Sequence, residues 1–433
     1  MRLRIVAAAL VAGLLAIVAG TASQGTAATT RTQAKTLTVW LMVDAQSGWQ
    51  NAVDAATRTF QSAHPGVDVN VEYQTWGTHL QKLDATLAGG NVPDVVEMGN
   101  TEMMKYMVAG AFADLSADRA SFPNSGSWIK ALAKQGTYAG KTYGVPYYAG
   151  TRMVIYRTDY YKKAGITKAP TSLAAFVADG KKLMNVYGGK DKTFSAFYLA
   201  GRDWYTGLSF VYDYGGKIAA TQHGLWKGVL DSPKAIKGLT ALKSTFLALS
   251  RASKTTDEAH PFPTTPFAQG HAASFAGPAW QWGYALDPKA GNPKLTPYMG
   301  AYALPSHVAG KAMPGFVGGS LLAIPSPSPN KALAEDWIRD FTSTANETTI
   351  AKAGNIANTT TLLSLAKGNP RLQAQADAAA NGWAVPQAAN WVNVENAGVL
   401  QNMLTQIFTG KLTVKAAAQA ASDSITSILN ASA

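Results

Sequence analysis

The chain reads Leu37-Thr-Val-Trp-Leu-Met-Val43, an apolar run long enough for one buried strand, and an amphipathic segment follows at 49–63. Apolar side chains recur in that segment at the three- and four-residue spacing of a helix. The sequence then gives an alternating strand at 67–71, a second helical segment at 78–88 and a third strand at 94–98. This β-α-β-α-β order predicts a largely parallel sheet with helices on both faces.

The rest of the chain continues in short elements. Residues 44–48 are expected to form a turn between the first strand and its helix. Strands are expected at 152–156, 300–305 and 318–325, and helices at 331–341, 399–408 and 414–429. The chain shows neither a repeat of fixed period nor a long low-complexity linker, so its lobes should be joined by several short crossings.

One loop concentrates aromatic side chains, Gly277-Pro-Ala-Trp-Gln-Trp-Gly283. An indole face stacks readily on the C–H face of a sugar ring. For an isolated pair of tryptophans, packing beneath the turn is an equal alternative. Only 15% of the residues are charged, however, and aromatic residues recur at other loop or strand-end positions, which favours a groove for a neutral, hydroxyl-rich ligand; these residues are Trp40, Trp49, Trp76, Trp204, Tyr205, Trp383 and Trp391.

The first 28 residues are interpreted as a secretory signal peptide. Arg2 and Arg4 precede an apolar run at 5–20, and small residues give cleavage points after Ala22 or Ala27. A positively charged N-terminal region, a short apolar run and small residues at the cleavage site are typical of such a signal peptide. The alternative is a retained N-terminal anchor, although the run is shorter than the roughly 20 residues of a membrane span. We expect a secreted protein at the outer face of the cell membrane.

The chain has no cysteine. Its stability must therefore come from a large core rather than from disulfides. Zinc sites built on cysteine, a thiol nucleophile and a lipid-modified lipobox cysteine are excluded as well. Without the leader, about 405 residues remain, 433 minus 28, which indicates two or three domains.

The formal net charge of +12 is dispersed along the chain, and its densest clusters are short pairs such as Lys162-Lys163 and Lys181-Lys182. Nucleic-acid binding generally requires a basic stripe. We therefore expect no nucleic-acid partner and interpret the charge as a solvated basic surface.

The sequence carries few signals of catalysis. The six histidines are scattered without metal-ligand spacing, and the chain contains no nucleophile elbow, phosphate-binding loop or dinucleotide fingerprint. A glycoside hydrolase would need two facing carboxylates, for which Asp44, Glu97, Glu102 and Asp203 are candidates. We predict no catalytic residue, no metal site and no cofactor.

Several motifs occur in the order found in one family. They are NVPDVVEM at 91–98, a glycine-to-leucine segment at 110–115, YGVPYYAGTRMVIYR at 143–157, SPNKALAEDWIRDF at 328–341 and FTGKLTVKAAAQAA at 408–421. With the first strand, they resemble the extracellular solute-binding proteins of ABC sugar importers, of the maltose-binding-protein type. The resemblance spans the chain from Leu37 to about Ile428.

The resemblance implies a set of ligand-binding residues. In the family, the loop after the first strand and the segment after the proline-aspartate strand contact sugar hydroxyls, and aromatic residues stack on the rings. The chain departs from the family at two places. Ala279 stands where the family often has tryptophan, with Trp280 one position later, and Arg152 stands near the place of an acid on the crossover strand. The implied set is Asp44, Trp76, Asn100, Thr101, Glu102, Arg152, Trp204, Tyr205, Trp280, Trp282 and Trp391.

The resemblance also implies the fold, a type II periplasmic-binding-protein architecture in which two α/β lobes enclose a ligand cleft. The first lobe is expected at 36–146 and 304–343, the second at 147–303 and 344–433, with hinge crossings near Pro146, Leu304 and Ser343. The expected function is capture of a sugar or oligosaccharide by a monomer for the transmembrane permease subunits of an ABC transporter. The alternatives are a secreted carbohydrate-active hydrolase and a binding protein for a non-sugar solute, an anion or a polyamine.

Overall fold

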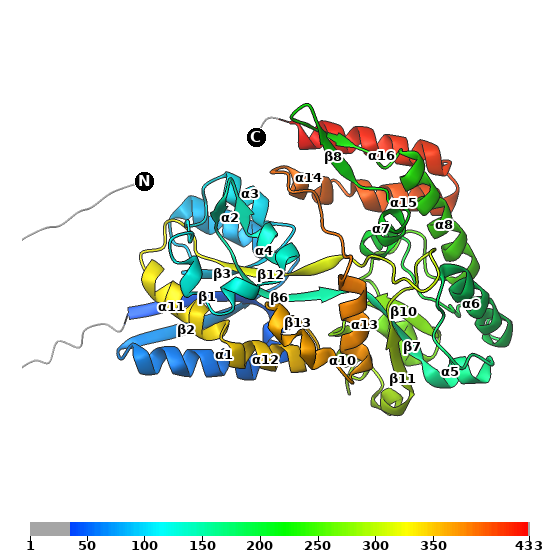
Figure 1. Ribbon diagram of the computed structural model, residues 1–433, viewed down its shortest axis with the longest axis horizontal. Helices are drawn as coiled ribbons and strands as arrows, with labels where there is room; N and C mark the ends of the chain where they lie inside the picture. The colour runs from blue at the N-terminus through cyan, green and yellow to red at the C-terminus, as the bar shows by residue number, and fades with distance from the viewer. Residues whose placement is uncertain (1–34, 432–433) are drawn as a thin grey trace, which may run out of the picture.

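The computed structural model describes residues 35–431 and shows two lobes side by side (Figure 1). The segment interpreted as a signal peptide lies outside the described residues. Each lobe contains its own β-sheet and its own clusters of buried apolar side chains. The two-lobe arrangement agrees with the expectation from the sequence.

The first lobe is built on a six-stranded sheet in the order β13-β6-β12-β3-β1-β2. Its strands are β1 (Lys35–Met42), β2 (Val67–Gln74), β3 (Val95–Gly99), β6 (Val145–Thr151), β12 (Val317–Ala323) and β13 (Ile356–Ala357). β1 pairs in parallel with both β2 and β3, as predicted. β12 lies antiparallel between β3 and β6, so the sheet is mixed rather than largely parallel.

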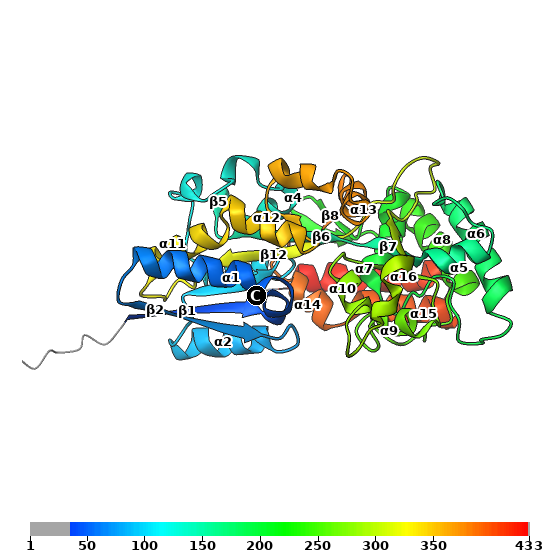
Figure 2. The same ribbon diagram turned by 90° about the horizontal axis from the view of Figure 1, so that it is seen from below.

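Helices cover both faces of this sheet, as the sequence pattern predicts (Figure 2). On one face, Leu37, Val39 and Leu41 of β1 pack with side chains of three helices, α1 (Val43–Ala63), α11 (Lys331–Phe341) and α12 (Thr344–Lys352). On the other face, Trp40 packs with side chains of α2 (His79–Gly89), α3 (Met103–Val108) and α4 (Lys130–Gln135). A short hairpin, β4 (Thr137–Tyr138) and β5 (Lys141–Thr142), follows α4.

The second lobe contains a three-stranded antiparallel sheet in the order β10-β7-β11. Its strands are β7 (Met153–Arg157), β10 (Ser274–Gly277) and β11 (Met299–Tyr302). A separate hairpin of β8 (Ala219–Gln222) and β9 (Leu225–Gly228) packs on α16. The helices after the first lobe are α5 (Thr158–Lys163), α6 (Leu173–Tyr187), α7 (Trp204–Asp213), α8 (Pro233–Leu249), α9 (Thr264–Gln269), α10 (Gln281–Ala285), α13 (Pro370–Ala379), α14 (Trp391–Asn396), α15 (Val399–Thr409) and α16 (Val414–Leu429).

The chain changes lobes at places other than those expected. β6 of the first sheet and β7 of the second are separated only by Arg152, so the first crossing lies there rather than near Pro146. Leu304 and Phe316 pack in the core of the second lobe, and β12 begins at Val317, so the second crossing follows Phe316. Both boundaries come from strand pairing, which a local sequence pattern does not reveal.

The third boundary also differs. Residues 344–357 were expected in the second lobe, but α12 packs on α1 and β13 pairs with β6, both in the first lobe. The chain passes to the second lobe through α13, which contacts β6 on one side and β7 and β11 on the other. β13 has only two residues, too few to show strand periodicity in a sequence.

The segment after β1 is helical rather than a turn. α1 begins at Val43 directly after the strand, and its first turns continue to Trp49, where the backbone leaves helical geometry at φ −150° and ψ 41°. Asp44 therefore stands in the first turn of a helix at the carboxyl end of β1. In open α/β sheets, this end of the strands is where ligands bind.

Candidate ligand-binding site

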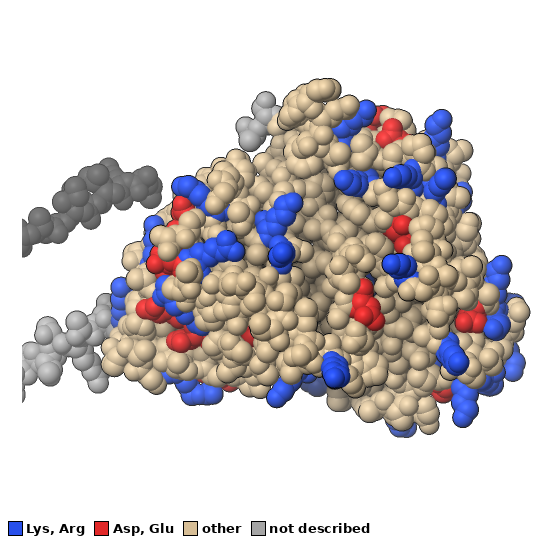
Figure 3. Space-filling view, viewed as in Figure 1, with Lys and Arg blue, Asp and Glu red and all other residues tan. Residues whose placement is uncertain are grey.

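A cavity of about 390 Å³ lies between the two lobes, at the carboxyl ends of β1 and β3. Its volume falls within the range of small-molecule sites in proteins. The space-filling view shows the surface recessed where the lobes meet, with basic side chains scattered over both (Figure 3). The first lobe contributes Asp44, Trp76, Gly99, Asn100, Thr101, Glu102, Tyr148, Gly318, Gly319 and Ser320, and the rest of the wall is formed by Arg152, Tyr205, Glu258, Ala259, Phe262, Pro278, Trp280, Gln281, Tyr284 and Phe316.

Trp280 is held against the first lobe by a close fit over a glycine. It follows Pro278 after β10, and its ring meets that of Tyr148 edge-on, with centroids 6.1 Å apart. A Cβ atom on Gly150 would lie 2.4 Å from Cζ3 of Trp280, so only glycine leaves room for the indole at that position. Since Gly150 is on β6, the Trp280 indole spans the joint between the lobes.

Asp44 connects both lobes through its carboxylate. Trp76 Nε1 donates a hydrogen bond to Oδ2 over 2.6 Å, and the Tyr284 hydroxyl donates to Oδ1 over 2.9 Å. Trp76 belongs to the first lobe and is 42% exposed, whereas Tyr284 lies on α10 of the second lobe. The carboxylate therefore fixes one aromatic side chain from each side of the cavity.

The segment after β3 supplies polar groups to the cavity. Glu102 Oε2 accepts hydrogen bonds from the Gly99 amide and from His79 Nε2, each over 2.9 Å. Burial disfavours the charged form of His79, but the hydrogen bond and the charge of Glu102 outweigh it, and the pKa of His79 is raised. The His79 ring in turn meets Trp76 edge-on at 5.2 Å, so this pair also orients the exposed indole.

Arg152 lies at the first crossing and places a positive charge on the second-lobe side of the cavity. Its guanidinium lies 4.4 Å from the ring centroid of Tyr205, and its Nε is 3.8 Å from Asp203 Oδ1. Burial raises the pKa of Glu258 to about 7, the charge of Asp203 adds to this, and Arg152 opposes it. A polar ligand that entered this corner would meet both donors and acceptors.

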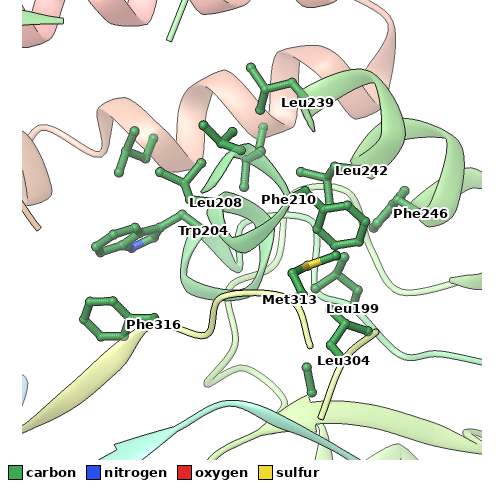
Figure 4. Close-up of a cluster of buried hydrophobic side chains, with 14 of the residues drawn as sticks. Leu199, Trp204, Leu208, Phe210, Leu239, Leu242, Phe246, Leu304, Met313 and Phe316 are labelled. Carbon is green, nitrogen blue, oxygen red and sulfur yellow. The ribbon is translucent and has the colours of Figure 1, made fainter. Parts of the chain in front are cut away.

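Three predicted residues do not line the cavity. Trp204 and Trp391 are 3% and 1% exposed and pack in the second-lobe core, where Trp204 lies beside Leu208 and Phe316 (Figure 4). Trp282 lines a different hollow, beside β11. The eight others, Asp44, Trp76, Asn100, Thr101, Glu102, Arg152, Tyr205 and Trp280, meet at the cavity.

Part of the wall of the interlobe cavity was not predicted from the sequence. Tyr148 and Tyr284 could have been proposed, because one follows a tyrosine in the crossover segment and the other stands four residues after Trp280. Glu258, Phe262 and Phe316 carry no such signal, because they come from loops that only the tertiary fold brings to the cavity.

Glu395 forms a second contact between the lobes. Its carboxylate accepts hydrogen bonds from Trp391 Nε1 over 2.7 Å and from Thr101 Oγ1 of the first lobe over 3.4 Å. Burial raises the pKa of Glu395 to about 8, and the charge of Glu102 adds to the shift, while the two hydrogen bonds oppose it. At neutral pH the contact therefore contains a largely neutral carboxyl group.

This raised pKa predicts a pH dependence of stability. A carboxyl group whose pKa is higher in the folded state stabilises the fold below its unfolded pKa, and that stability is lost as the pH rises through about 8. Between pH 5 and pH 9, the melting temperature should therefore fall less in Glu395→Gln than in the parent protein. Asp377→Asn, the same charge change on an exposed position, serves as control. Parallel curves for all three proteins would contradict the assignment.

Two further features of residues 35–431 bear on the type of site. These residues contain no group of three or more histidine, aspartate or glutamate side chains that could hold a metal ion. None of its helices combines the length and the apolar character needed to cross a membrane.

Similarity to known proteins was found at three levels. The family model for bacterial extracellular solute-binding proteins matches residues 40–348. The diacetylchitobiose binding protein DasA of Streptomyces coelicolor is 33% identical over 389 residues, which cover 89% of this chain and 88% of that protein. Among solved structures, the GacH receptor of Streptomyces glaucescens, described unliganded and with acarbose, has a TM-score of 0.77 at 18% identity, over 92% of this chain and 98% of that one.

A second solved structure gives the same fold. The substrate-binding protein Lmo0181 of Listeria monocytogenes, in complex with cycloalternan, has a TM-score of 0.75 at 18% identity, over 90% of this chain and 98% of that one. At such identities the likeness is one of fold, and the fold class expected from the sequence is confirmed.

Proposed function

The chain belongs to the family of bacterial extracellular solute-binding proteins, and from this premise we propose that it captures a sugar or oligosaccharide between its lobes and delivers it to the permease of an ABC transporter. The observation that supports this most is the interlobe cavity, which places aromatic rings of both lobes around carboxylate, amide and guanidinium groups. Aromatic faces bind the apolar faces of sugar rings, and planar polar groups bind their hydroxyls.

The two kinds of contact have separate roles in the proposed mechanism. Each stacked ring contributes on the order of 1 kcal/mol. The polar groups select the stereochemistry, because a buried polar group left unpaired costs about 1–3 kcal/mol. A ligand that touches both lobes favours the closed form in proportion to its higher affinity for that form.

The ligand class is tested by calorimetry against a panel of oligosaccharides. Diacetylchitobiose is the first candidate, because the relative at 33% identity is named for binding it. The cognate sugar should bind with one-to-one stoichiometry and stabilise the fold by about 2.7 kcal/mol at a hundredfold excess over its Kd. A panel in which amino acids, polyamines or inorganic anions bind and saccharides do not would contradict the proposal.

The family membership supports a proposal for where the protein works and with which partners. We propose that the protein works outside the cytoplasm as a monomer and that its partners are the ligand and the permease subunits. Because the chain contains no cysteine, we also propose that the protein stays at the cell surface without a cysteine-linked lipid anchor. Sedimentation at micromolar concentration tests the monomer, since a dimer would sediment faster.

We also propose that the protein binds without catalysis. Incubation with the cognate oligosaccharide should leave it intact, and EDTA should leave its affinity unchanged. Asp44 and Glu102 already accept hydrogen bonds from neighbouring side chains, which suits a binding role. Cleavage that disappears in Glu102→Gln or Asp44→Asn would instead identify a hydrolase.

A further inference from the structure

Trp282 lines a second hollow, of about 500 Å³, which the proposed transport function leaves without a role. The hollow lies where α10, β11 and the beginning of α13 come together (Figure 1). Tyr156 of β7 shares its wall with Trp282, so the hollow offers two aromatic side chains. Both side chains are partly exposed.

Arg371 gives this hollow an uncompensated charge. It is the one charged residue among those that line the hollow, and within residues 35–431 its guanidinium has neither a salt bridge nor a hydrogen bond. The guanidinium carbon lies 5.8 Å from the Trp282 ring centroid. Gly354 makes room for it, because a Cβ atom there would lie 3.2 Å from that carbon.

In the part of the chain that the structure describes, no acidic side chain is paired with Arg371. Burial lowers the pKa of Arg371, and no neighbouring carboxylate opposes that shift. A half-buried guanidinium costs solvation energy unless an anion compensates it. Its planar fork of donors fits a carboxylate in a bidentate arrangement.

Uncharged hydrogen-bonding groups complete the hollow. β11 is an edge strand, paired with β7 on one side only, so half of the backbone groups at Met299–Tyr302 have no strand partner. The Asn369 side-chain oxygen accepts hydrogen bonds from the amides of Arg371 and Leu372, and its amide group remains without a partner in the described chain. The unpaired backbone groups of β11 and the Asn369 amide can therefore form hydrogen bonds with hydroxyl groups of a ligand.

We propose that this hollow is a second saccharide site, selective for a sugar that carries a carboxylate, such as a uronic acid. Arg371 binds the carboxylate, Trp282 stacks on the sugar ring, and β11 with Asn369 binds hydroxyls. The site is independent of the interlobe cavity, which contains neither Trp282 nor Arg371.

The test is a ligand-observed NMR titration with D-glucuronate, with D-glucuronamide as the uncharged analogue and inorganic phosphate as the bare anion. The titration is run on the full chain in the Trp280→Ala background, which weakens the interlobe cavity and keeps every residue that lines this hollow. Glucuronate should bind about tenfold or more tightly than glucuronamide, because only the carboxylate forms charge-assisted hydrogen bonds with the guanidinium. Arg371→Gln should remove that difference, and Trp282→Ala should weaken both sugars.

Three results would overturn the proposal. Equal affinities for glucuronate and glucuronamide would show that the guanidinium does not bind the carboxylate, and this comparison stands even if Arg371→Gln fails to fold. Unchanged affinity in Trp282→Ala, with competition by phosphate, would indicate a simple anion site. Glucuronate binding that is lost on Trp280→Ala alone would place the acid in the interlobe cavity. None of these results depends on whether the protein binds neutral oligosaccharides.

Discussion

Trp280→Ala is expected to weaken binding of the cognate sugar by tenfold or more, equivalent to at least about 1.4 kcal/mol. The indole lies in the cavity wall, rests over Gly150 of the first lobe and meets Tyr148 edge-on. Its removal deletes a stacking surface and also the packing contacts with Tyr148 and Gly150. Calorimetry on the purified variant measures the loss directly.

Trp282→Ala is the matched control for this prediction. The two tryptophans are two residues apart, but Trp282 lines the other hollow. Its replacement should leave the affinity for a neutral oligosaccharide within about twofold. Equal losses in the two variants, or an unchanged Trp280→Ala protein, would contradict the placement of the sugar in the interlobe cavity.

Asp44→Ala is expected to weaken sugar binding by about tenfold to a hundredfold. The carboxylate accepts hydrogen bonds from Trp76 on one lobe and Tyr284 on the other. Hydrogen bonds to a charged group contribute about 1.5–3 kcal/mol each. The substitution leaves both donors without their acceptor, so it should loosen the Trp76 indole and make closure less favourable.

Tyr284→Phe separates these two effects. It keeps the Trp76–Asp44 hydrogen bond and removes only the one that crosses between the lobes. We expect a smaller loss of affinity than in Asp44→Ala, expressed mainly as faster ligand release, because the open form is left unchanged. An affinity for sugar in Asp44→Ala equal to that of the parent would show that the carboxylate plays no part in binding or closure.

Much of the first lobe was predictable because its signals are local. The helix expected at 331–341 matches α11 residue for residue, and β1, β2 and β3 begin and end within three residues of the expected strands. α11 repeats its apolar residues at helical spacing, β2 alternates apolar and polar residues, and β1 is a short continuous apolar run, so each signal is contained in the segment itself. The family resemblance then supplied the two-lobe arrangement that the local pattern could not.

The errors occurred where pairing between distant residues decides the structure. β12 is an apolar segment like β3, and nothing in its sequence shows that it runs antiparallel between β3 and β6. Residues 44–48 contain serine and glycine, which favour a turn, yet they extend α1 to its kink at Trp49. In both cases tertiary packing outweighs local propensity.

The same limit applies to the site. Trp204 and Trp391 occupy sequence positions that match sugar-stacking residues of the family, but helices α7 and α14 direct both rings into the core of the second lobe. Trp280 and Trp282, by contrast, are separated by one residue and end in different hollows. Which face of a short helix meets a cavity depends on how that helix packs on the rest of the fold. The sequence of the helix shows which residues it contains but not how it is packed.

The central claim is that a sugar bridges both lobes and closes them, and small-angle X-ray scattering with and without the cognate sugar tests it most directly. The contacts of Asp44 with Tyr284 and of Thr101 with Glu395 cross the cavity rim and should form fully only in the closed state. The account predicts a smaller radius of gyration at saturating sugar, with the change in Trp280→Ala displaced to at least about tenfold higher sugar concentration. An identical radius of gyration for the free and the saturated parent protein would contradict closure and indicate a rigid groove.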